Sequence, residues 1–279
     1  RGLAKILTPT WTDKFFEVRT SMLLTNPVTQ LRNISGNVQA LGARVLEVGT
    51  SPLMDTILSV GGKARSRAVW VGELPAEARG MWRGIGLGAK AAGAELQKII
   101  TGAVPISSRI EEAGVRQQAI GGVTGRIIRI PFNLLSATDE FFKAILREGA
   151  LDSRAYRIAK SEGLAGAELV KRHAGLLKEL PPDLVKAANL IAKEFTFQSD
   201  LASPLTKGIN LARRHPVVRF VVPFFKTPVD IAKWIANRAP LTSLVTPRNL
   251  KGLMAGGAEQ SEAAARIFIA HAFGAVGVT

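Results

Sequence analysis

The chain has 279 residues, of which 47% are hydrophobic, a proportion too high for a disordered tail. Thirty-seven lysines and arginines stand against 22 acidic residues, and the formal net charge of +15 favours an anionic partner, either a phosphate backbone or acidic lipid head groups. The absence of cysteine excludes disulfides, thiolate catalysis and cysteine-based zinc sites. Aromatic residues make up only 6%, so small apolar side chains dominate and favour close helix packing.

The first predicted helix covers residues 28–48, after Asn26 and Pro27, which suit the N-cap and N1 positions. Its apolar residues recur every three or four positions, at Leu31, Ile34, Val38, Leu41, Val45 and Val48. This spacing predicts an amphipathic helix.

A second predicted helix opens at Pro75 and runs to about residue 100. One stripe of it holds Trp82, Ile85, Ala89, Ala92, Leu96 and Ile99. Its glycines, at 80, 84, 86, 88 and 93, each weaken an isolated helix by roughly 1 kcal/mol relative to alanine. We therefore expect a packed neighbour.

The third predicted helix begins at Thr138, Asp139 and Glu140, because acidic residues stabilise the positive end of a helix dipole. Its apolar face holds Phe142, Ile145 and Leu146. Basic residues on and after this face are expected to contact phosphate groups of DNA or lipid: Arg147, Arg154, Arg157 and Lys160. Two further helices, 164–180 and 184–197, are separated by Pro181, Pro182 and Asp183.

The segment 200–251 is the most distinctive part of the chain, with nine basic residues against two acidic and six prolines. Its apolar centre is only about ten residues long, whereas a membrane-spanning helix needs about 20, and Pro216 and Pro223 interrupt it. An interfacial or buried position is therefore expected.

A helix is then predicted with Thr227 as N-cap, Pro228 at N1 and Asp230 at N3. Ile231, Trp234 and Ile235 share one face, opposite a face with Lys226, Asp230, Lys233 and Asn237. Docking on a membrane or a partner and plain packing with a solvated polar face are equally compatible with this pattern. The residues expected to make the membrane or partner contact are Arg213, Arg214, Arg219, Phe220, Phe224, Phe225, Lys226, Ile231, Lys233, Trp234 and Ile235.

Catalytic and metal-binding patterns are weak. The glycines at 84, 86 and 88 imitate a phosphate loop, but no strand precedes them. His173, His215 and His271 have no second ligand at helical spacing. The acidic pairs 111–112 and 139–140 point apart by about 100 degrees on a helix and suit helix starts better than acid–base chemistry. We expect no catalytic residue, metal or cofactor, and no enzyme activity.

The signals together predict an all-α fold, an extended multi-helix array with small-residue packing, proline-broken connections and no significant sheet. Three regions are expected: 1–135, 136–203 and 204–279. Arg1 stands where a methionine is usual and the chain stops within an apolar run, so we also expect a longer parent polypeptide.

Three stretches resemble segments of very large phage virion proteins: TNPVTQLRNISGNV at 25–38, SATDEFFKAI at 136–145 and PFFKTPVDIAKW at 223–234. In this order and spacing they resemble the internal virion proteins, or ejection proteins, of short-tailed bacteriophages and the related large polyvalent phage proteins, over about residues 25–240. Some members carry a peptidoglycan-cleaving domain, but this chain has no glutamate in a matching motif.

The resemblance implies a protein stored inside the virion near the portal and ejected into the host cell envelope, where it oligomerises into a conduit for DNA. The implied partners are copies of itself in a ring, other internal virion proteins, the portal, phage DNA and the host membrane. The alternative is a DNA-binding or portal-associated core protein inside the capsid, without a membrane role.

Overall fold

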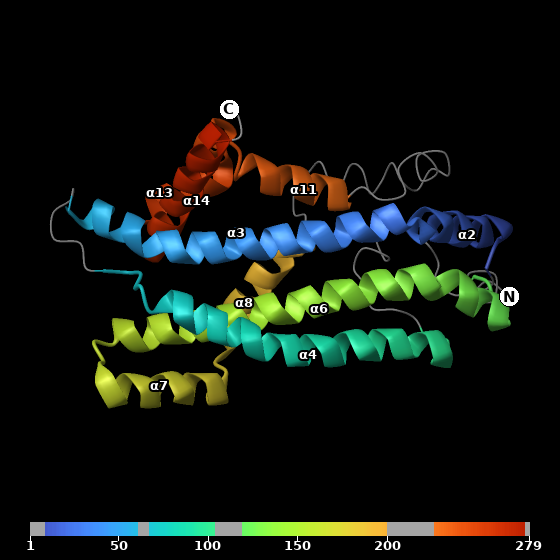
Figure 1. Ribbon diagram of the computed structural model, residues 1–279, viewed down its shortest axis with the longest axis horizontal. Helices are drawn as coiled ribbons and strands as arrows, with labels where there is room; N and C mark the ends of the chain where they lie inside the picture. The colour runs from blue at the N-terminus through green and yellow to red at the C-terminus, as the bar shows by residue number, and fades with distance from the viewer. Residues whose placement is uncertain (1–8, 61–66, 104–118, 200–225, 277–279) are drawn as a thin grey trace, which may run out of the picture.

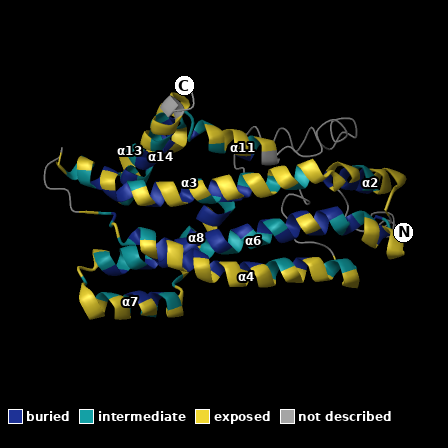
Figure 2. Cartoon of the chain, viewed as in Figure 1, coloured by how far each residue is buried: buried dark blue, intermediate teal, exposed yellow. Residues whose placement is uncertain are grey.

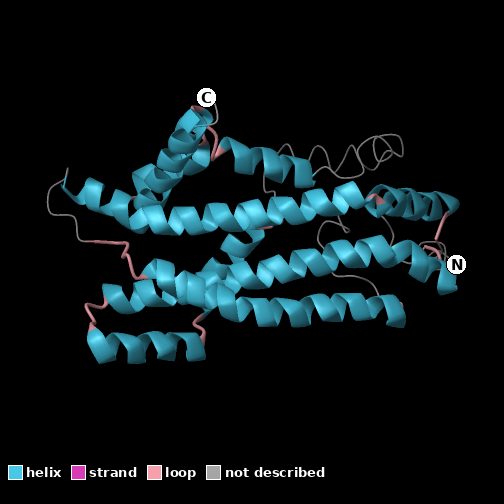
Figure 3. Cartoon of the chain, in the orientation of Figure 1, coloured by secondary structure: helices cyan, strands magenta, loops and turns pink. Residues whose placement is uncertain are grey.

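The computed structural model describes residues 9–60, 67–103, 119–199 and 226–276, with the backbone alone at 226–227 and 274–276. These ranges form ten helices joined by loops, and none of the described residues forms a strand (Figure 1, Figure 3). The predicted all-α class is confirmed. The helices are α2 Trp11–Thr25, α3 Pro27–Val60, α4 Glu73–Thr101, α6 Gly122–Ser161, α7 Gly166–Glu179, α8 Pro182–Phe195, α11 Lys226–Ala236, α12 Thr242–Val245, α13 Pro247–Ala255 and α14 Gly257–Val276.

Helices α3, α4 and α6 lie along the long axis of the molecule (Figure 1). The largest apolar core lies where α6, α7 and α8 meet, and its most deeply buried large side chains are Leu146, Leu151 and Phe195. Small residues fill the spaces between these side chains, among them Ala150, Ala155, Ala188 and Ala192. This agrees with the prediction that small residues mediate the packing.

Helix α3 begins where the sequence predicts, with Asn26 Oδ1 accepting a hydrogen bond from the Val28 amide at 2.9 Å. The helix continues through Pro52 to Val60, so it is longer than the predicted range 28–48. Buried and exposed residues alternate along this helix (Figure 2). Four residues of the predicted apolar stripe face outward, Leu31, Ile34, Val38 and Val45, with Leu31 64% and Val38 52% exposed, whereas Leu41 packs against the core and Val48 is buried. The buried face instead carries Asn37, Ala40, Arg44, Glu47 and Val48, together with Ser51, Pro52, Met54 and Asp55. The helix is amphipathic, but for most of this stripe it is the polar face that is buried.

Helix α4 has the packed neighbour that its glycines require. Gly80, Gly84 and Gly88 form a row against α6, and a Cβ atom at Gly84 would lie 2.7 Å from the Cα atom of Ile145. The two helices are antiparallel and approach each other backbone to backbone. The predicted apolar stripe again faces away from this contact, with Trp82 76% exposed.

Helix α6 corrects the predicted start at Thr138–Glu140. It begins at Gly122 and runs through Pro131 to Ser161, so these residues lie in mid-helix. Asp139 is 1% exposed and accepts a hydrogen bond from the Asn33 side chain at 3.5 Å, so it links α6 to α3 and does not cap a helix start. The expected boundary between residues 135 and 136 falls inside this continuous helix.

Helices α7 and α8 lie where Pro181 and Pro182 predict them, with Pro182 in the first turn of α8. Helix α11 is also present, but it begins at Lys226, so Thr227 lies inside the helix and not at the N-cap.

Candidate interaction groove and the buried charge cluster

A groove of about 540 Å³ lies between the end of α2, the first half of α3 and α11. Most of its wall is apolar, and its polar groups come mainly from α3. The lining residues are Leu23, Leu24, Thr29, Arg32, Asn33, Gly36, Gln39, Leu135, Phe197, Pro228, Ile231, Trp234 and Ile235.

Aromatic and cation–π contacts hold the α11 wall of the groove in place. The Trp234 ring meets Phe197 edge to face, with centroids 5.7 Å apart. The Arg238 guanidinium lies 4.5 Å from the Trp234 ring centroid and 4.7 Å from that of Phe195. Such cation–π contacts stabilise a ring in one orientation. Ile231 and Ile235 stay 37% and 51% exposed on the same helix.

Two of the three stretches that resemble phage virion proteins line the groove, and the third adjoins it. Thr29, Arg32, Asn33 and Gly36 come from the stretch 25–38, while Pro228, Ile231 and Trp234 come from 223–234. Leu135 directly precedes 136–145, and Asp139 within that stretch contacts Asn33. Segments far apart in the chain are thus neighbours in space.

The predicted contact residues divide into three groups. Ile231, Trp234 and Ile235 line the groove, and Lys233 is exposed on α11. The structure describes only the backbone of Lys226. The others lie outside the described residues: Arg213, Arg214, Arg219, Phe220, Phe224 and Phe225.

The prediction that the polar face of α11 is solvated is wrong in part. Asp230 and Asn237 are only 5% and 8% exposed, because this side of α11 packs into the protein. Helical periodicity placed both residues opposite the isoleucines correctly, but it does not show which of two faces is covered.

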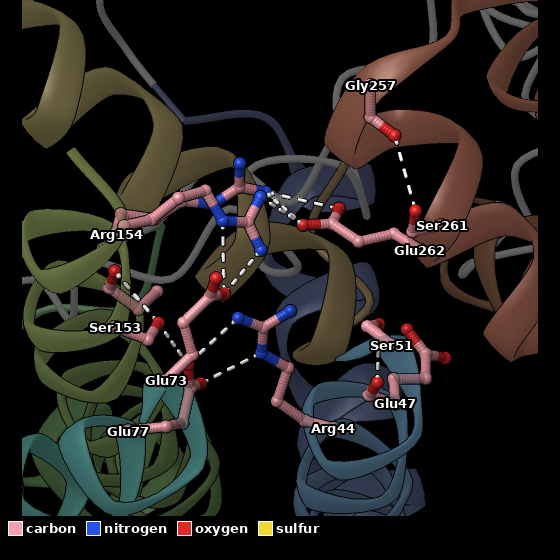
Figure 4. Close-up of polar contacts among 12 residues, drawn as sticks. Arg44, Glu47, Ser51, Glu73, Glu77, Ser153, Arg154, Gly257, Ser261 and Glu262 are labelled. Atoms are coloured by element: carbon pink, nitrogen blue, oxygen red, sulfur yellow. Dashed lines mark hydrogen bonds and ion pairs between the residues drawn. The ribbon is translucent and has the colours of Figure 1, made fainter. Parts of the chain in front are cut away.

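A cluster of buried ion pairs lies where α3, α4, α6 and α14 meet (Figure 4). Arg44 on α3 binds Glu77 on α4 through two bonds of 2.8 and 2.9 Å, and Ser153 on α6 donates to the same carboxylate. Both side chains of the Arg44–Glu77 pair are at least 93% buried. Because bidentate guanidinium–carboxylate pairs fix geometry as well as charge, these contacts hold the helices in register.

Two arginines that were expected to contact phosphate belong to this cluster. Arg157 binds Glu73 at 2.6 Å and Glu262 at 2.7 Å, and Arg154 binds Glu262 at 3.1 Å. The structure thus assigns both guanidinium groups to internal cross-links between α6, α4 and α14. The pattern of charges along α6 gave no sign of these partners, which lie more than 80 positions away in the chain.

The other two residues of that set lie nearer the surface. Arg147 binds Glu148 at 2.8 Å and Asn189 at 3.0 Å, and Lys160 donates to the Leu164 carbonyl at 3.3 Å. A phosphate contact by Arg147 or Lys160 stays a prediction.

A second branch of the cluster centres on Glu194 at the end of α8. Arg238 bridges Glu47 at 2.7 Å and Glu194 at 3.0 Å, and Arg248 also pairs with Glu194. Burial of the Glu194 carboxylate opposes its ionisation, but the charges of Arg248, Arg238 and Arg266 outweigh this effect and lower its pKa to about 2.

The lowered pKa of Glu194 predicts acid sensitivity. A carboxylate with a depressed folded-state pKa stabilises the fold above its unfolded pKa, and this stabilisation is lost as the pH falls through the folded value. At neutral pH the contribution is about 3 kcal/mol. We expect the free energy of unfolding, measured with urea, to fall between about pH 5 and pH 2. A Glu194→Gln variant should be less stable at neutral pH, and its free energy of unfolding should fall less steeply as the pH decreases over this range. An equal slope in both proteins would contradict this assignment.

The histidines within the described ranges have structural partners. His173 Nε2 lies 2.9 Å from Asp152 Oδ1, whose carboxylate also meets Arg79 and Arg83. His271 Nε2 accepts a hydrogen bond from the Leu241 amide at 3.3 Å. In the part of the chain that the structure describes, no three His, Asp or Glu side chains are grouped to hold a metal ion.

Comparisons with protein-family models, curated proteins and solved structures find no match to this chain. None of the helices among the described residues has the length and apolar content needed to cross a membrane.

Proposed function

We propose that this chain is a structural segment of an internal virion protein of a short-tailed bacteriophage, which is ejected into the host envelope and assembles there into a conduit for DNA. Its role is assembly and insertion, without catalysis. The observation that supports this proposal is that two of the resembling stretches, 25–38 and 223–234, line one groove, and that the third contacts it through Asp139 and Asn33. Contacts among α3, α6 and α11 place these separate stretches close together, and this proximity supports the resemblance.

The charge cluster and the exposed apolar residues support an assembly role. Matched ion pairs hold the helices of the cluster together, while large apolar side chains such as Trp11, Trp82 and Leu31 are mostly exposed. Monomeric soluble proteins rarely leave large contiguous apolar patches uncovered, and such patches commonly mark contacts with other macromolecules. In the proposed role, neighbouring copies and lipid cover these side chains.

The test is assembly on membranes. We expect the purified chain to form a defined oligomer on vesicles with anionic lipid, seen by mass photometry after detergent extraction and by negative-stain microscopy. The same vesicles should release an encapsulated fluorescent dextran. A chain that stays monomeric and leaves the vesicles intact would contradict the proposal.

The basic segment 200–251 is the part that this proposal places at the membrane or the neighbouring subunit. Replacing Arg213, Arg214 and Arg219 with glutamate should abolish dextran release. The matched control places glutamate at Lys171, Lys178 and Lys186, which are exposed on α7 and α8 outside this segment, and lowers the net charge by the same amount. Equal loss of release in both variants would show that only the overall charge matters.

The alternative, a DNA-associated core protein, makes a different prediction. Its affinity for duplex DNA would fall steeply with salt, with a slope set by the number of phosphates neutralised. The internal pairing of Arg154 and Arg157 leaves fewer cations for this role. Steep salt dependence without vesicle binding would favour the alternative.

A further inference from the structure

One end of the molecule has an inverted distribution of polar and apolar residues. It consists of α2, residues 28–46 of α3, residues 87–101 of α4 and residues 122–139 of α6, which lie together at one end of the long axis (Figure 1), and we call it the inverted end. Its exposed large apolar residues are Trp11, Phe15, Met22, Leu23, Val28, Leu31, Ile34, Val38, Val45, Leu46, Leu87, Leu96, Ile100, Val123, Ile127 and Leu134. Its buried polar residues are Glu17, Thr20, Ser21, Asn37, Arg44, Glu95, Arg129, Asn133, Ser136 and Asp139.

The interior of the inverted end combines polar contacts with a small apolar cluster of Leu24, Phe132 and Leu135. Glu17 on α2 binds Arg129 on α6 at 3.0 Å and accepts the Ile120 amide at 2.8 Å. Ser136 on α6 donates to Glu95 on α4 at 3.0 Å. Part of the buried polar set is paired in this way, while buried side-chain atoms of Thr20, Asn37 and Asn133 have no hydrogen-bond partner among the described residues. The outer faces of the same helices carry the apolar side chains.

The charges of the inverted end are sorted in the same way. In its described ranges Glu17, Glu95 and Asp139 are buried, and the remaining carboxylate, Asp13, caps the first turn of α2, so none of these acidic residues is exposed. The exposed charged side chains there are cations: Lys14, Arg32, Lys90 and Arg126. An apolar outer face with cations and no exposed carboxylate is complementary to a surface whose outer layer is anionic and whose interior is apolar.

We propose that the inverted end docks on an anionic lipid surface, with its outer apolar side chains in the interfacial region and its cations at the head groups. Interfacial helices bind through this combination of apolar area and basic charge. Trp11, 79% exposed and stacked on Phe15 with centroids 6.1 Å apart, suits the interface that tryptophan prefers. This inference rests on the membrane part of the proposed function and names the surface and the lipid class.

The apolar contribution is tested by flotation with vesicles of phosphatidylcholine and phosphatidylglycerol. Serine replacements at Met22, Leu31 and Val38 should weaken vesicle binding by about tenfold or more. The matched control places serine at Met254, Leu190 and Val170, which are the same residue types, exposed on α13, α8 and α7. The control should bind like the unchanged chain. Thermal melting of both variants checks that they are folded.

The charge contribution has its own test. Binding of the unchanged chain to pure phosphatidylcholine vesicles should be weaker by about tenfold. Lys14→Glu with Arg32→Glu should reduce binding to the anionic vesicles, while Lys178→Glu with Lys186→Glu changes it much less. Equal binding to both kinds of vesicle would overturn the anionic lipid assignment.

Two further outcomes separate this inference from the alternatives. If the serine variant at Met22, Leu31 and Val38 binds vesicles normally but loses a dimer that the unchanged chain forms without lipid, a second copy covers this end and the inference is wrong. If the unchanged chain binds vesicles through the inverted end but neither oligomerises nor releases dextran, the inference stands and the conduit proposal fails.

Discussion

Replacing Gly84 with alanine is expected to destabilise the protein by about 3 kcal/mol, although alanine is the better helix former. The added Cβ atom would lie 2.7 Å from the Cα atom of Ile145, closer than real Cβ contacts come. Its nearest neighbours are backbone atoms of α6, which cannot rotate away like a side chain. Helices α4 and α6 must therefore move apart, and the contacts on both sides of this crossing weaken.

Gly86 provides the matched control, two residues further along the same helix. No heavy atom lies within 4 Å of a Cβ atom at that position. Gly86→Ala should therefore stabilise the protein by about 0.5–1 kcal/mol, through helix propensity alone. Urea unfolding of both variants measures the two effects. An increase in stability for both would mean that α4 and α6 do not approach each other as described.

The same comparison shows what the sequence could predict. Five glycines in α4 indicate a close neighbour, and Gly80, Gly84 and Gly88 do face one. Local sequence also marks the start of α3 at Asn26 and Pro27, and the break between α7 and α8 at Pro181. These features depend on residues near one another in the chain, so local patterns suffice to find them.

Such local patterns do not show which face of a helix is buried. A period of three and four residues shows that α3 is amphipathic, but burying its polar side requires partners for Arg44 and Glu47. Those partners are Glu77 and Arg238, which lie 33 and 191 positions away from them. Buried polar groups are stable only when paired, so the choice of face depends on contacts that no local window contains.

The candidate groove was predictable only in part. Ile231, Trp234 and Ile235 share a face in the sequence pattern and share a wall of the groove in the structure. Phe197, in the turn after α8, and Leu135, on α6, complete the wall and have no local signal. Arg154 and Arg157 show the reverse case, since their surface role followed from charge alone, whereas the acceptors Glu73 and Glu262 place them inside.

Removing the Glu262 carboxylate is expected to destabilise the fold by about 3–5 kcal/mol. Glu262 binds both Arg154 and Arg157, and its burial is outweighed by their charges, which hold its pKa well below the usual range. In Glu262→Ala the Arg157 and Arg154 side chains stay only 13% and 26% exposed, and Arg154 loses its carboxylate partner. Breaking one member of a buried ion pair costs more than the pair itself contributes, because the remaining charge is desolvated without compensation.

The surface pair Glu162–Arg172 is the matched control for this change. Its geometry is as good as that of the cluster, with contacts of 2.9–3.1 Å, but both side chains are more than one third exposed. Glu162→Ala should therefore change the urea midpoint at pH 7 very little, because exposed ion pairs are well solvated when broken. Adding Arg154→Met to Glu262→Ala should recover part of the lost stability, since it removes the unpaired charge. If Glu262→Ala behaves like Glu162→Ala, the buried cluster does not hold α6 and α14 together.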